Sequence, residues 1–413
     1  MYLTVINTSL SMRLHMYICI KIFTVDSFSF DDTSIAFSGK TNSELKQEYR
    51  LFKLMNNNTL VNIGIKATMF AIKSGLPVKG LIKATIYKQF CGGETLEETR
   101  HVIDTLKNYN IKTILDYGVE GKENEAEFER TKSQLLHTIQ FTKGNPNIPF
   151  ISSKITGLVR FALLEKMQKK EVLNAEEEKE KQQLYERMHL IASHAKDAGI
   201  GLFIDAEETW IQDPVDELTF DLMRTYNKEK AVVFSTPQMY RHDRLEFCKR
   251  SLEDAKKHNY ILGLKPVRGA YMEKERKRAA DMGYPSPIQP DKAATDRDYD
   301  AVIIFALDNK EHIGFCAATH NEKSALLLAT EMDNRNIARD HSHFWFSQLY
   351  GMNDQITYNL AKAGFNVTKY LPYGPVKDVM PYLMRRAEEN TSVAGQMSRD
   401  LNLIHKEMQR RGM

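Results

Sequence analysis

The chain has 413 residues, of which 57 are Lys or Arg and 54 are Asp or Glu, so its formal net charge at pH 7 is +3. With 27% charged and 42% hydrophobic residues, the composition is that of a globular protein and excludes a largely disordered chain. The near balance of charge argues against a nucleic-acid partner, which would require a basic excess or stripe. Four widely spaced cysteines without a CxxC pair argue against a disulfide scaffold, and no metal site is expected.

Residues 1–40 are predicted to form a poorly ordered leader. The first 25 residues are apolar and hydroxyl-rich, with Arg13 and Lys21 and no acidic residue before Asp26. The segment is interpreted either as an unstructured leader or as a targeting segment. Its longest apolar run, residues 14–25, is too short to span a bilayer.

Residues 41–110 are predicted to form a helical arm. The stretch from Tyr49 to Gly93 contains no Asp or Glu but several basic residues, namely Arg50, Lys53, Lys66, Lys73, Lys79, Lys83 and Lys88. Such a stretch is typical of a helix that lies on an anionic membrane surface. It equally fits an arm that packs on the main domain and exposes its lysines to solvent, and this interpretation is preferred.

From residue 111 onward, short apolar runs alternate with longer helical patterns. Eight runs read as buried strands: 111–117, 150–155, 200–205, 231–235, 260–267, 313–318, 343–346 and 364–370. Alternating strand and helix patterns indicate a parallel sheet, and eight of them predict a distorted (β/α)8 TIM-like barrel over residues 111–395. An open doubly wound sheet is the second interpretation, although no GxGxxG follows the first strand. Residues 396–413 are predicted to form a helical tail.

Two connections of the predicted barrel are unusual. Residues 166–181 are strongly charged and are predicted to extend the helix that follows the second strand. Residues 273–300 follow the fifth strand and contain one glycine and three prolines, so they are predicted to form a long loop that covers the active site.

Polar residues follow the carboxyl ends of several predicted strands, where a barrel enzyme places its active site. They are Lys154, Asp205, Gln238, Lys265, the Arg268–Tyr271 segment, Thr319, His320 and Tyr370, with Arg385, Arg386 and Glu389 on the final helix. The lysines and arginines together predict a site for an anion such as a carboxylate or a phosphate. Gly269 and Ala270 leave backbone that a phosphate or a ring system is expected to approach closely.

Four segments resemble the proline dehydrogenase family. They are Lys265–Tyr271 (KPVRGAY), Ala318–Glu322 (ATHNE), Gln348–Met352 (QLYGM) and Tyr370–Gly374 (YLPYG), the last followed by Tyr382–Asn390 (YLMRRAEEN). The resemblance extends from about residue 111 to residue 392. It implies a barrel that binds FAD non-covalently, oxidises L-proline to Δ1-pyrroline-5-carboxylate and passes electrons to a membrane quinone.

The resemblance also assigns roles to individual residues. Arg385, Arg386 and Lys154 match ligands of the proline carboxylate, Leu349 and Tyr370 match side chains that line the proline ring, and Glu389 matches a carboxylate that orients the arginines. Asp205 and Lys265 match active-site residues. The positions that match residues at or beside the FAD are Ala206, Gln238, Val267, Arg268, Gly269, Ala270, Tyr271, Thr319 and His320.

Alternative activities remain open at this stage. In the related hydroxyproline dehydrogenases the position of Tyr370 carries a small side chain, so Tyr370 favours proline over hydroxyproline as the substrate. Lys265 stands where many bifunctional bacterial members have arginine, which leaves the flavin contact there less defined. A barrel aldolase that uses Lys154 or Lys265 for a Schiff base, or a non-catalytic relative, are the other hypotheses.

The resemblance carries expectations about partners and location. No aldehyde dehydrogenase domain is recognised after the barrel, so a separate pyrroline-5-carboxylate dehydrogenase is expected downstream. Peripheral contact with a membrane is expected, because the quinone is there. The expected location is the cytoplasm at the inner membrane, with the matrix side of the mitochondrial inner membrane as the alternative.

Overall fold

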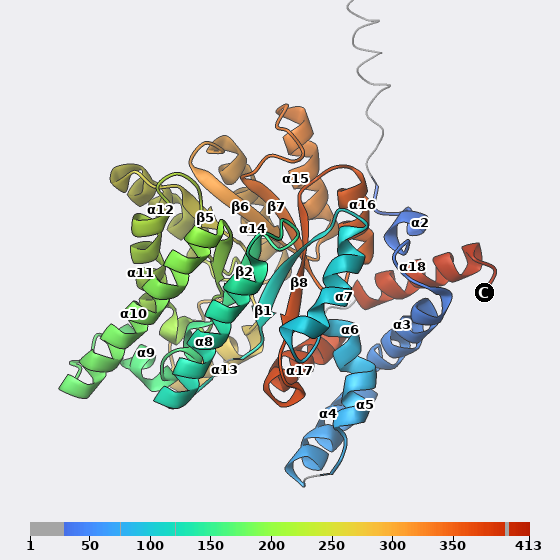
Figure 1. The fold of residues 1–413 in the computed structure, drawn as a ribbon, viewed down its shortest axis with the longest axis horizontal. Coiled ribbons are helices and arrows are strands. Elements are labelled where there is room, and N and C mark those ends of the chain that lie inside the picture. The colour runs from blue at the N-terminus through green and yellow to red at the C-terminus, as the bar shows by residue number, and fades with distance from the viewer. Residues whose placement is uncertain (1–28, 75, 120, 393–395) are drawn as a thin grey trace, which may run out of the picture.

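Eight parallel strands form a closed barrel in a computed structural model that describes residues 29–74, 76–119, 121–392 and 396–413. They are β1 (Lys112–Tyr117), β2 (Phe150–Ser153), β3 (Gly201–Ile204), β4 (Val233–Ser235), β5 (Leu262–Leu264), β6 (Ile313–Ala318), β7 (Phe344–Leu349) and β8 (Val367–Tyr373). Each strand pairs with its neighbour in sequence, and β8 returns to β1 (Figure 1). The predicted (β/α)8 barrel is confirmed, and the open doubly wound sheet is excluded.

All eight predicted runs overlap a strand, but the last two strands end later than predicted. β7 continues to Leu349 through Ser347 and Gln348, and β8 continues to Tyr373 through Pro372. The polar residues and the proline hide these strand ends in the sequence pattern. In the observed register Leu349 lies opposite Tyr370, so these two predicted ring-lining residues are neighbours.

The helices of the barrel surround the strands. They are α8 (Glu125–Thr142), α10 (Ala175–Ala198), α11 (Thr209–Tyr226), α12 (Arg244–His258), α14 (Lys292–Asp308), α15 (Glu322–Asn334), α16 (Asp354–Lys362) and α17 (Val376–Ser392). The 3₁₀ turn η2 (Ile155–Gly157) and the helix α9 (Phe161–Gln168) follow β2, and α13 (Met272–Met282) follows β5.

Both predictions for the long connections are wrong. Residues 166–181 do not form one helix, because Asn174 accepts hydrogen bonds from the backbone of Glu176 and Glu177 and starts α10 as a separate helix. Residues 273–300 are not a loop, since α13 and the start of α14 occupy most of the segment. Gly283 ends α13 in the left-handed conformation, at φ 71°.

The interior of the barrel is filled mainly by aromatic side chains. It contains Ile114, Phe150, Phe203, Phe234, Cys316, Trp345 and Tyr370. The rings of Phe150 and Phe203 are stacked with centroids 4.6 Å apart. Burying each such ring stabilises the fold by about 1.5–3 kcal/mol. Because these rings fill the barrel, the polar groups of the strands gather at the carboxyl ends.

The N-terminal arm consists of α2 (Thr33–Ala36), α3 (Asn42–Met55), α4 (Asn58–Lys73), α5 (Lys79–Ile82), the π-helix η1 (Lys83–Tyr87), α6 (Lys88–Phe90) and α7 (Leu96–Lys107). Together with α17 and α18 (Gln396–Arg410) its helices form a second hydrophobic core beside the barrel (Figure 1). The predicted arm is therefore present. None of the helices in the described ranges has an apolar stretch long enough to cross a membrane.

The domain boundaries stay predictions. The boundary at residue 40 falls after α2, which packs against α16. The Asn359 side chain on α16 also donates a hydrogen bond to the backbone carbonyl of Asp32, the N-cap residue of α2. Residues 1–28 of the predicted leader lie outside the described residues. The boundary at residue 395 falls just before α18.

Candidate active site

Asp205 is the centre of a cluster at the carboxyl ends of the strands. It follows β3 and accepts hydrogen bonds from Lys154 Nζ at 3.1 Å, from Tyr370 Oη at 2.7 Å and from Lys265 Nζ. Lys154 follows β2, Lys265 follows β5 and Tyr370 belongs to β8, so four strands contribute. The structure thus brings together four of the residues that the sequence analysis selected separately.

The pKa values of two buried carboxyl groups at this end of the barrel, Asp205 and Asp116, are shifted in opposite directions. Burial alone would raise the pKa of Asp205, but the charges of Lys265 and Lys154 and the hydrogen bonds of Lys265 and Tyr370 hold it well below its usual value. Asp116 on β1 is also buried, and burial together with the charge of Asp205 raises its pKa against the attraction of Lys154. The structure therefore favours an ionised Asp205 beside a carboxyl group that more readily keeps its proton.

The hydroxyl of Tyr370 forms hydrogen bonds with two residues, Asp205 and Ser152. Besides its bond to Asp205, it lies 2.8 Å from the Ser152 hydroxyl on β2. The Lys265 ammonium lies 5.2 Å from the centre of the Tyr370 ring and 4.9 Å from that of Phe203. These contacts fix the ring beside Leu349 and keep the ammonium over aromatic faces.

The arginine pair lies on α17, which follows β8. Arg386 is 6% exposed, and its guanidinium lies 5.2 Å from the centre of the Tyr382 ring one turn earlier. Arg385 is partly buried on the same helix. The side chain of Glu389 lies outside the described part of the chain.

Arg268 connects the ends of β5 and β6. Its guanidinium donates to the Asp296 carboxylate at 2.7 Å, to the Thr319 hydroxyl at 2.7 Å and to the Ser324 hydroxyl at 2.9 Å, and it lies over the Tyr299 ring. Three acceptors from two helices and one loop hold this cation in one orientation. The predicted neighbours Arg268 and Thr319 are therefore in direct contact.

Gln238 connects the loops after β3, β4 and β5. Its amide donates to the carbonyl of Glu207 at 2.7 Å and accepts from the backbone of Ala270 at 3.3 Å. It also pairs through the backbone with Val267. Ala206 follows Asp205 directly, and Tyr271 is the first residue before α13, so both lie at this same end of the barrel.

Gly269 lies in a strained backbone conformation against an aromatic ring. It adopts φ 134°, and a Cβ atom there would lie 2.5 Å from the ring of Tyr240. The approach of a phosphate or a ring system to this backbone stays a prediction. The glycine is required by this packing and by its backbone conformation.

His320 follows β6 and is uncharged. Its Nδ1 lies 2.6 Å from the Oδ1 of Asn353. Burial, together with the charges of Arg386, Lys369 and Arg268, lowers its pKa to about 3. The imidazole can therefore take part in hydrogen bonds but does not serve as a cation.

Sequence reasoning missed three residues near the site. Asp116 ends the first predicted strand in the run TILDY, and its position alone would have selected it. Glu207 accepts from the backbone and hydroxyl of Thr156, and burial raises its pKa to about 7. Asn353 contacts His320 and directly follows the recognised segment Gln348–Met352, but it was not selected as a site residue.

Comparison with known proteins identifies a family. The proline dehydrogenase family model matches residues 99–399. The carbapenem antibiotics biosynthesis protein CarD of Pectobacterium carotovorum is 32% identical over 84% of this chain and 90% of its own length. Proline dehydrogenase 1 of Dictyostelium discoideum is 30% identical over 92% of this chain and 74% of its own length. A hydroxyproline dehydrogenase of Xenopus laevis is 30% identical over 93% of this chain and 90% of its own length.

Solved structures match the fold. Proline utilization A (PutA) from Bdellovibrio bacteriovorus, inactivated by N-propargylglycine, superposes with a TM-score of 0.70 at 20% identity. The match covers 88% of this chain but only 38% of that protein. At this level of identity the likeness supports the barrel fold alone.

Proposed function

Because the chain belongs to the proline dehydrogenase family, whose members are oxidoreductases of proline catabolism, we propose that it oxidises L-proline to Δ1-pyrroline-5-carboxylate with non-covalent FAD and passes the electrons to a membrane quinone. The observation that carries the proposal is the Asp205 cluster, with the Arg386 guanidinium on the helix that follows the last strand. The alternative is hydroxyproline oxidation, the activity named for the Xenopus relative.

The charges of the site suit a small zwitterion. Lys154, Arg385 and Arg386 are proposed to bind the proline carboxylate, since guanidinium groups pair well with carboxylates. Ionised Asp205 pairs with both Lys265 and Lys154 and offsets part of their positive charge. Leu349 and Tyr370 are proposed to press on the apolar ring, and Glu389 to orient the arginines.

The residues at the ends of β4, β5 and β6 fit FAD. Arg268 is an oriented cation for a phosphate or a flavin anion, and Thr319, Gln238 and uncharged His320 suit the neutral hydroxyl and amide groups of such a ligand. The proposed FAD-binding residues are Ala206, Gln238, Val267, Arg268, Gly269, Ala270, Tyr271, Thr319 and His320. The chemistry that FAD supplies when bound is hydride acceptance at flavin N5.

The side chains of this protein have to orient proline and exclude water. Hydride loss from the carbon beside nitrogen requires a neutral amine, and desolvation at the end of the barrel favours the neutral form. Asp205 accepts three hydrogen bonds and is ionised, so we assign it to holding Lys154, Lys265 and Tyr370 in place. Positioning contributes much of the rate in such a reaction.

An exposed apolar surface on the arm supports the proposed membrane contact. Half of the large hydrophobic side chains that are exposed in the described residues lie there, namely Leu54, Leu60, Ile63, Phe70, Leu76 and Leu81. We call these six residues the arm surface. The segment that carries them contains no acidic residue but seven basic ones. Apolar side chains among basic ones fit an anionic lipid surface.

The remaining partners are proposals as well. The product would be consumed by a separate pyrroline-5-carboxylate dehydrogenase. We place the protein in the cytoplasm at the inner membrane, and the mitochondrial matrix side is the alternative, in line with the mitochondrial names of several relatives.

The test is the visible absorbance spectrum of the purified protein after FAD addition, before and after anaerobic L-proline. A flavin band that proline bleaches supports the proposal, and a band that only 4-hydroxy-L-proline bleaches supports the alternative. Tyr370→Ser is expected to lower proline turnover and to improve 4-hydroxy-L-proline relative to proline, with Tyr370→Phe as the control that keeps the ring. A protein that binds no FAD contradicts both activities.

A further inference from the structure

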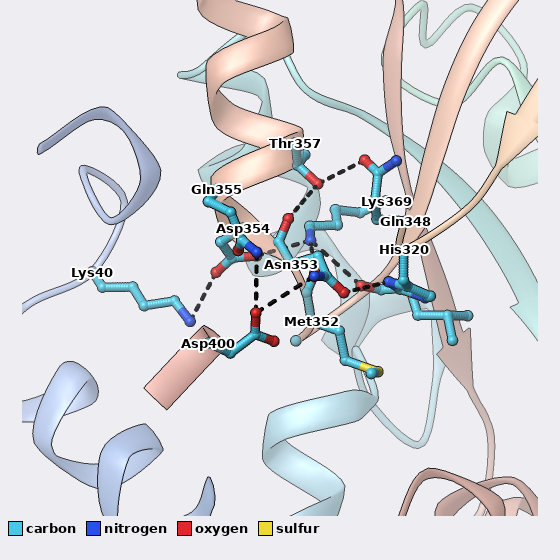
Figure 2. Close-up of polar contacts among 12 residues, drawn as sticks. Lys40, His320, Gln348, Met352, Asn353, Asp354, Gln355, Thr357, Lys369 and Asp400 are labelled. Atoms are coloured by element: carbon cyan, nitrogen blue, oxygen red, sulfur yellow. Dashed lines mark hydrogen bonds and ion pairs between the residues drawn. The ribbon is translucent and has the colours of Figure 1, made fainter. Parts of the chain in front are cut away.

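A chain of side chains connects His320 with the C-terminal helix α18 (Figure 2). His320 Nδ1 lies 2.6 Å from Asn353 Oδ1, and Asn353 Nδ2 donates to Asp400 Oδ1 at 3.5 Å. Gln355 Nε2 donates to the same carboxylate oxygen at 3.0 Å. Asn353 is the N-cap residue of α16, and Asp400 lies on α18. Three elements therefore meet in one hydrogen-bonded line.

The chemistry of the side chains decides which atom is the donor in each of these hydrogen bonds. Above about pH 7 the Asp400 carboxylate is ionised and only accepts hydrogen bonds, so it draws the NH₂ group of Asn353 toward itself and leaves the amide oxygen facing His320. An amide oxygen cannot donate, so the proton between Asn353 and His320 belongs to Nδ1 of the imidazole. Nε2 then carries a lone pair, and no described residue forms a hydrogen bond with it.

We propose that Asn353, oriented by Asp400, is a positioning residue that fixes His320 as the Nδ1–H tautomer and presents Nε2 as an acceptor for a hydroxyl group of the cofactor. The inference rests on the proposed function, because it takes the ligand of His320 to be FAD. It adds two residues outside the site described above, one of them on the C-terminal helix.

The loop that carries Asn353 is fixed from several sides. Asn353 adopts the left-handed conformation, at φ 51°, which asparagine tolerates better than most residues. Lys369 Nζ donates to the carbonyl of Met352 and pairs with Asp354 at 2.8 Å, and Lys40 of the arm pairs with the same carboxylate at 2.8 Å. The amide oxygen therefore has little freedom to leave His320.

A second connection reaches the residue before His320. Thr357 Oγ1 on α16 donates to Gln348 Oε1 at 2.9 Å, and Gln348 Nε2 donates to the carbonyl of Thr319 at 3.1 Å. The backbone at the end of β6 and the loop before α16 are thus held at a fixed separation. This geometry lets an amide one loop away define which nitrogen of the imidazole is protonated.

The test is the tautomer of His320, read from long-range ¹H–¹⁵N correlation spectra of protein with ¹⁵N-labelled histidine, with and without FAD. His320→Asn identifies the signals. At about pH 8, where Asp400 is ionised, we expect wild-type protein to show Nδ1–H alone. Asn353→Leu should yield a mixture or Nε2–H and bind FAD about tenfold more weakly, the loss expected for one hydrogen bond to a hydroxyl.

Two further variants separate positioning from packing. Asp400→Asn lets the Asn353 amide turn over and should also mix the tautomers. Arg399→Gln removes the contacts of α18 with Glu322 and Asp31 without touching Asn353, and should leave Nδ1–H unchanged.

Each outcome bears on the inference. Nε2–H in the wild type, or unchanged Nδ1–H in both Asn353→Leu and Asp400→Asn, overturns it, and so does a changed tautomer without any loss of FAD affinity. If Asn353→Leu does not fold, Asp400→Asn decides the tautomer question. Wild-type protein that keeps Nδ1–H but takes up no FAD supports the tautomer assignment and contradicts the proposed function.

Discussion

At the scale of single residues, the two carboxylates near Lys154 are expected to respond differently to the same change. Asp205 is held ionised by two lysines, whereas the pKa of Asp116 is raised by burial. Asp205→Asn should lower kcat/KM for proline about 100-fold, because Lys154 and Lys265 lose the acceptor that positions them. Asp116→Asn mimics a protonated carboxyl and should change it by less than about threefold.

The measurement is steady-state kcat/KM at pH 7.5 for both variants, each saturated with FAD. Equal losses in the two variants would contradict the assignment of different protonation states. The control is the thermal midpoint of each variant, which separates a kinetic effect from loss of the fold.

Asp400 makes a prediction about stability and pH. Burial raises its pKa to about 7, against the hydrogen bond from Gln355, whereas aspartate in an unfolded chain titrates near pH 4. Between about pH 4 and 7 the folded state keeps a proton that the unfolded state has lost. The contribution of Asp400 to the free energy of unfolding therefore falls as pH rises through this window, by up to ~4 kcal/mol.

Asp400→Asn removes that loss. We expect the variant to be more stable than the wild type at pH 8 and equal to it near pH 4.5, in urea denaturation at each pH. The other carboxylates, including Glu207, titrate in both proteins and cancel in the difference. A variant that is less stable at pH 8 would contradict the prediction.

At the scale of elements, the turn between β5 and α13 depends on Gly269. A Cβ atom there meets the Tyr240 ring, and φ 134° strains any other residue. Gly269→Ala should lower the free energy of unfolding by ~2–4 kcal/mol, from backbone strain and overpacking together. Gly283→Ala at the other end of α13 is the matched control.

Gly283 has positive φ as well, but its Cβ position is open. Gly283→Ala should lower the free energy of unfolding by about 1 kcal/mol, the cost of the backbone strain alone. Urea denaturation of both variants measures the difference, and equal costs would mean that the contact with Tyr240 does not matter.

The barrel was predictable because buried strands leave a strong signal. The runs were short and β-branched or aromatic, most of them were followed by a helical pattern, and all eight overlap a strand. The signal failed at the ends of β7 and β8, where Ser347, Gln348 and Pro372 interrupt the apolar pattern. The burial of Lys369, which is 1% exposed in β8 and pairs with Asp354, was likewise not visible in the local pattern.

The site was predictable in part for the same reason. Parallel strands bring their carboxyl ends together, so the position of Lys154, Asp205 and Lys265 in the sequence already implied their meeting. The Asn353–His320 contact could not be predicted, because it depends on the path of a loop. The filling of the space at Gly269 by Tyr240 depends likewise on tertiary packing.

At the scale of the whole molecule, the arm lies beside the end of the barrel that holds the site. α4 packs against α17, the helix that carries Arg385 and Arg386, and α4 and α5 extend beyond the barrel next to it (Figure 1). A membrane that contacts the arm surface would therefore lie near the site that the proposed quinone acceptor would have to reach. The position of the arm agrees with the proposed transfer of electrons.

The arm surface makes the last prediction. The protein should co-sediment with vesicles that contain anionic phospholipid, more weakly with zwitterionic vesicles and more weakly at high salt. The double variant Phe70→Glu/Leu81→Glu should bind at least tenfold more weakly, because two exposed apolar side chains no longer enter the lipid. Its proline oxidation with a soluble electron acceptor should equal that of the wild type.

Val172→Glu is the matched control, since Val172 is 95% exposed but lies between α9 and α10, away from the arm. It should bind vesicles as the wild type does. If the wild type does not bind anionic vesicles, and if it sediments as a dimer whereas the double variant sediments as a monomer, the arm surface joins two copies of the chain. Membrane contact through the arm would then be wrong, because a surface buried between two subunits cannot also bind lipid.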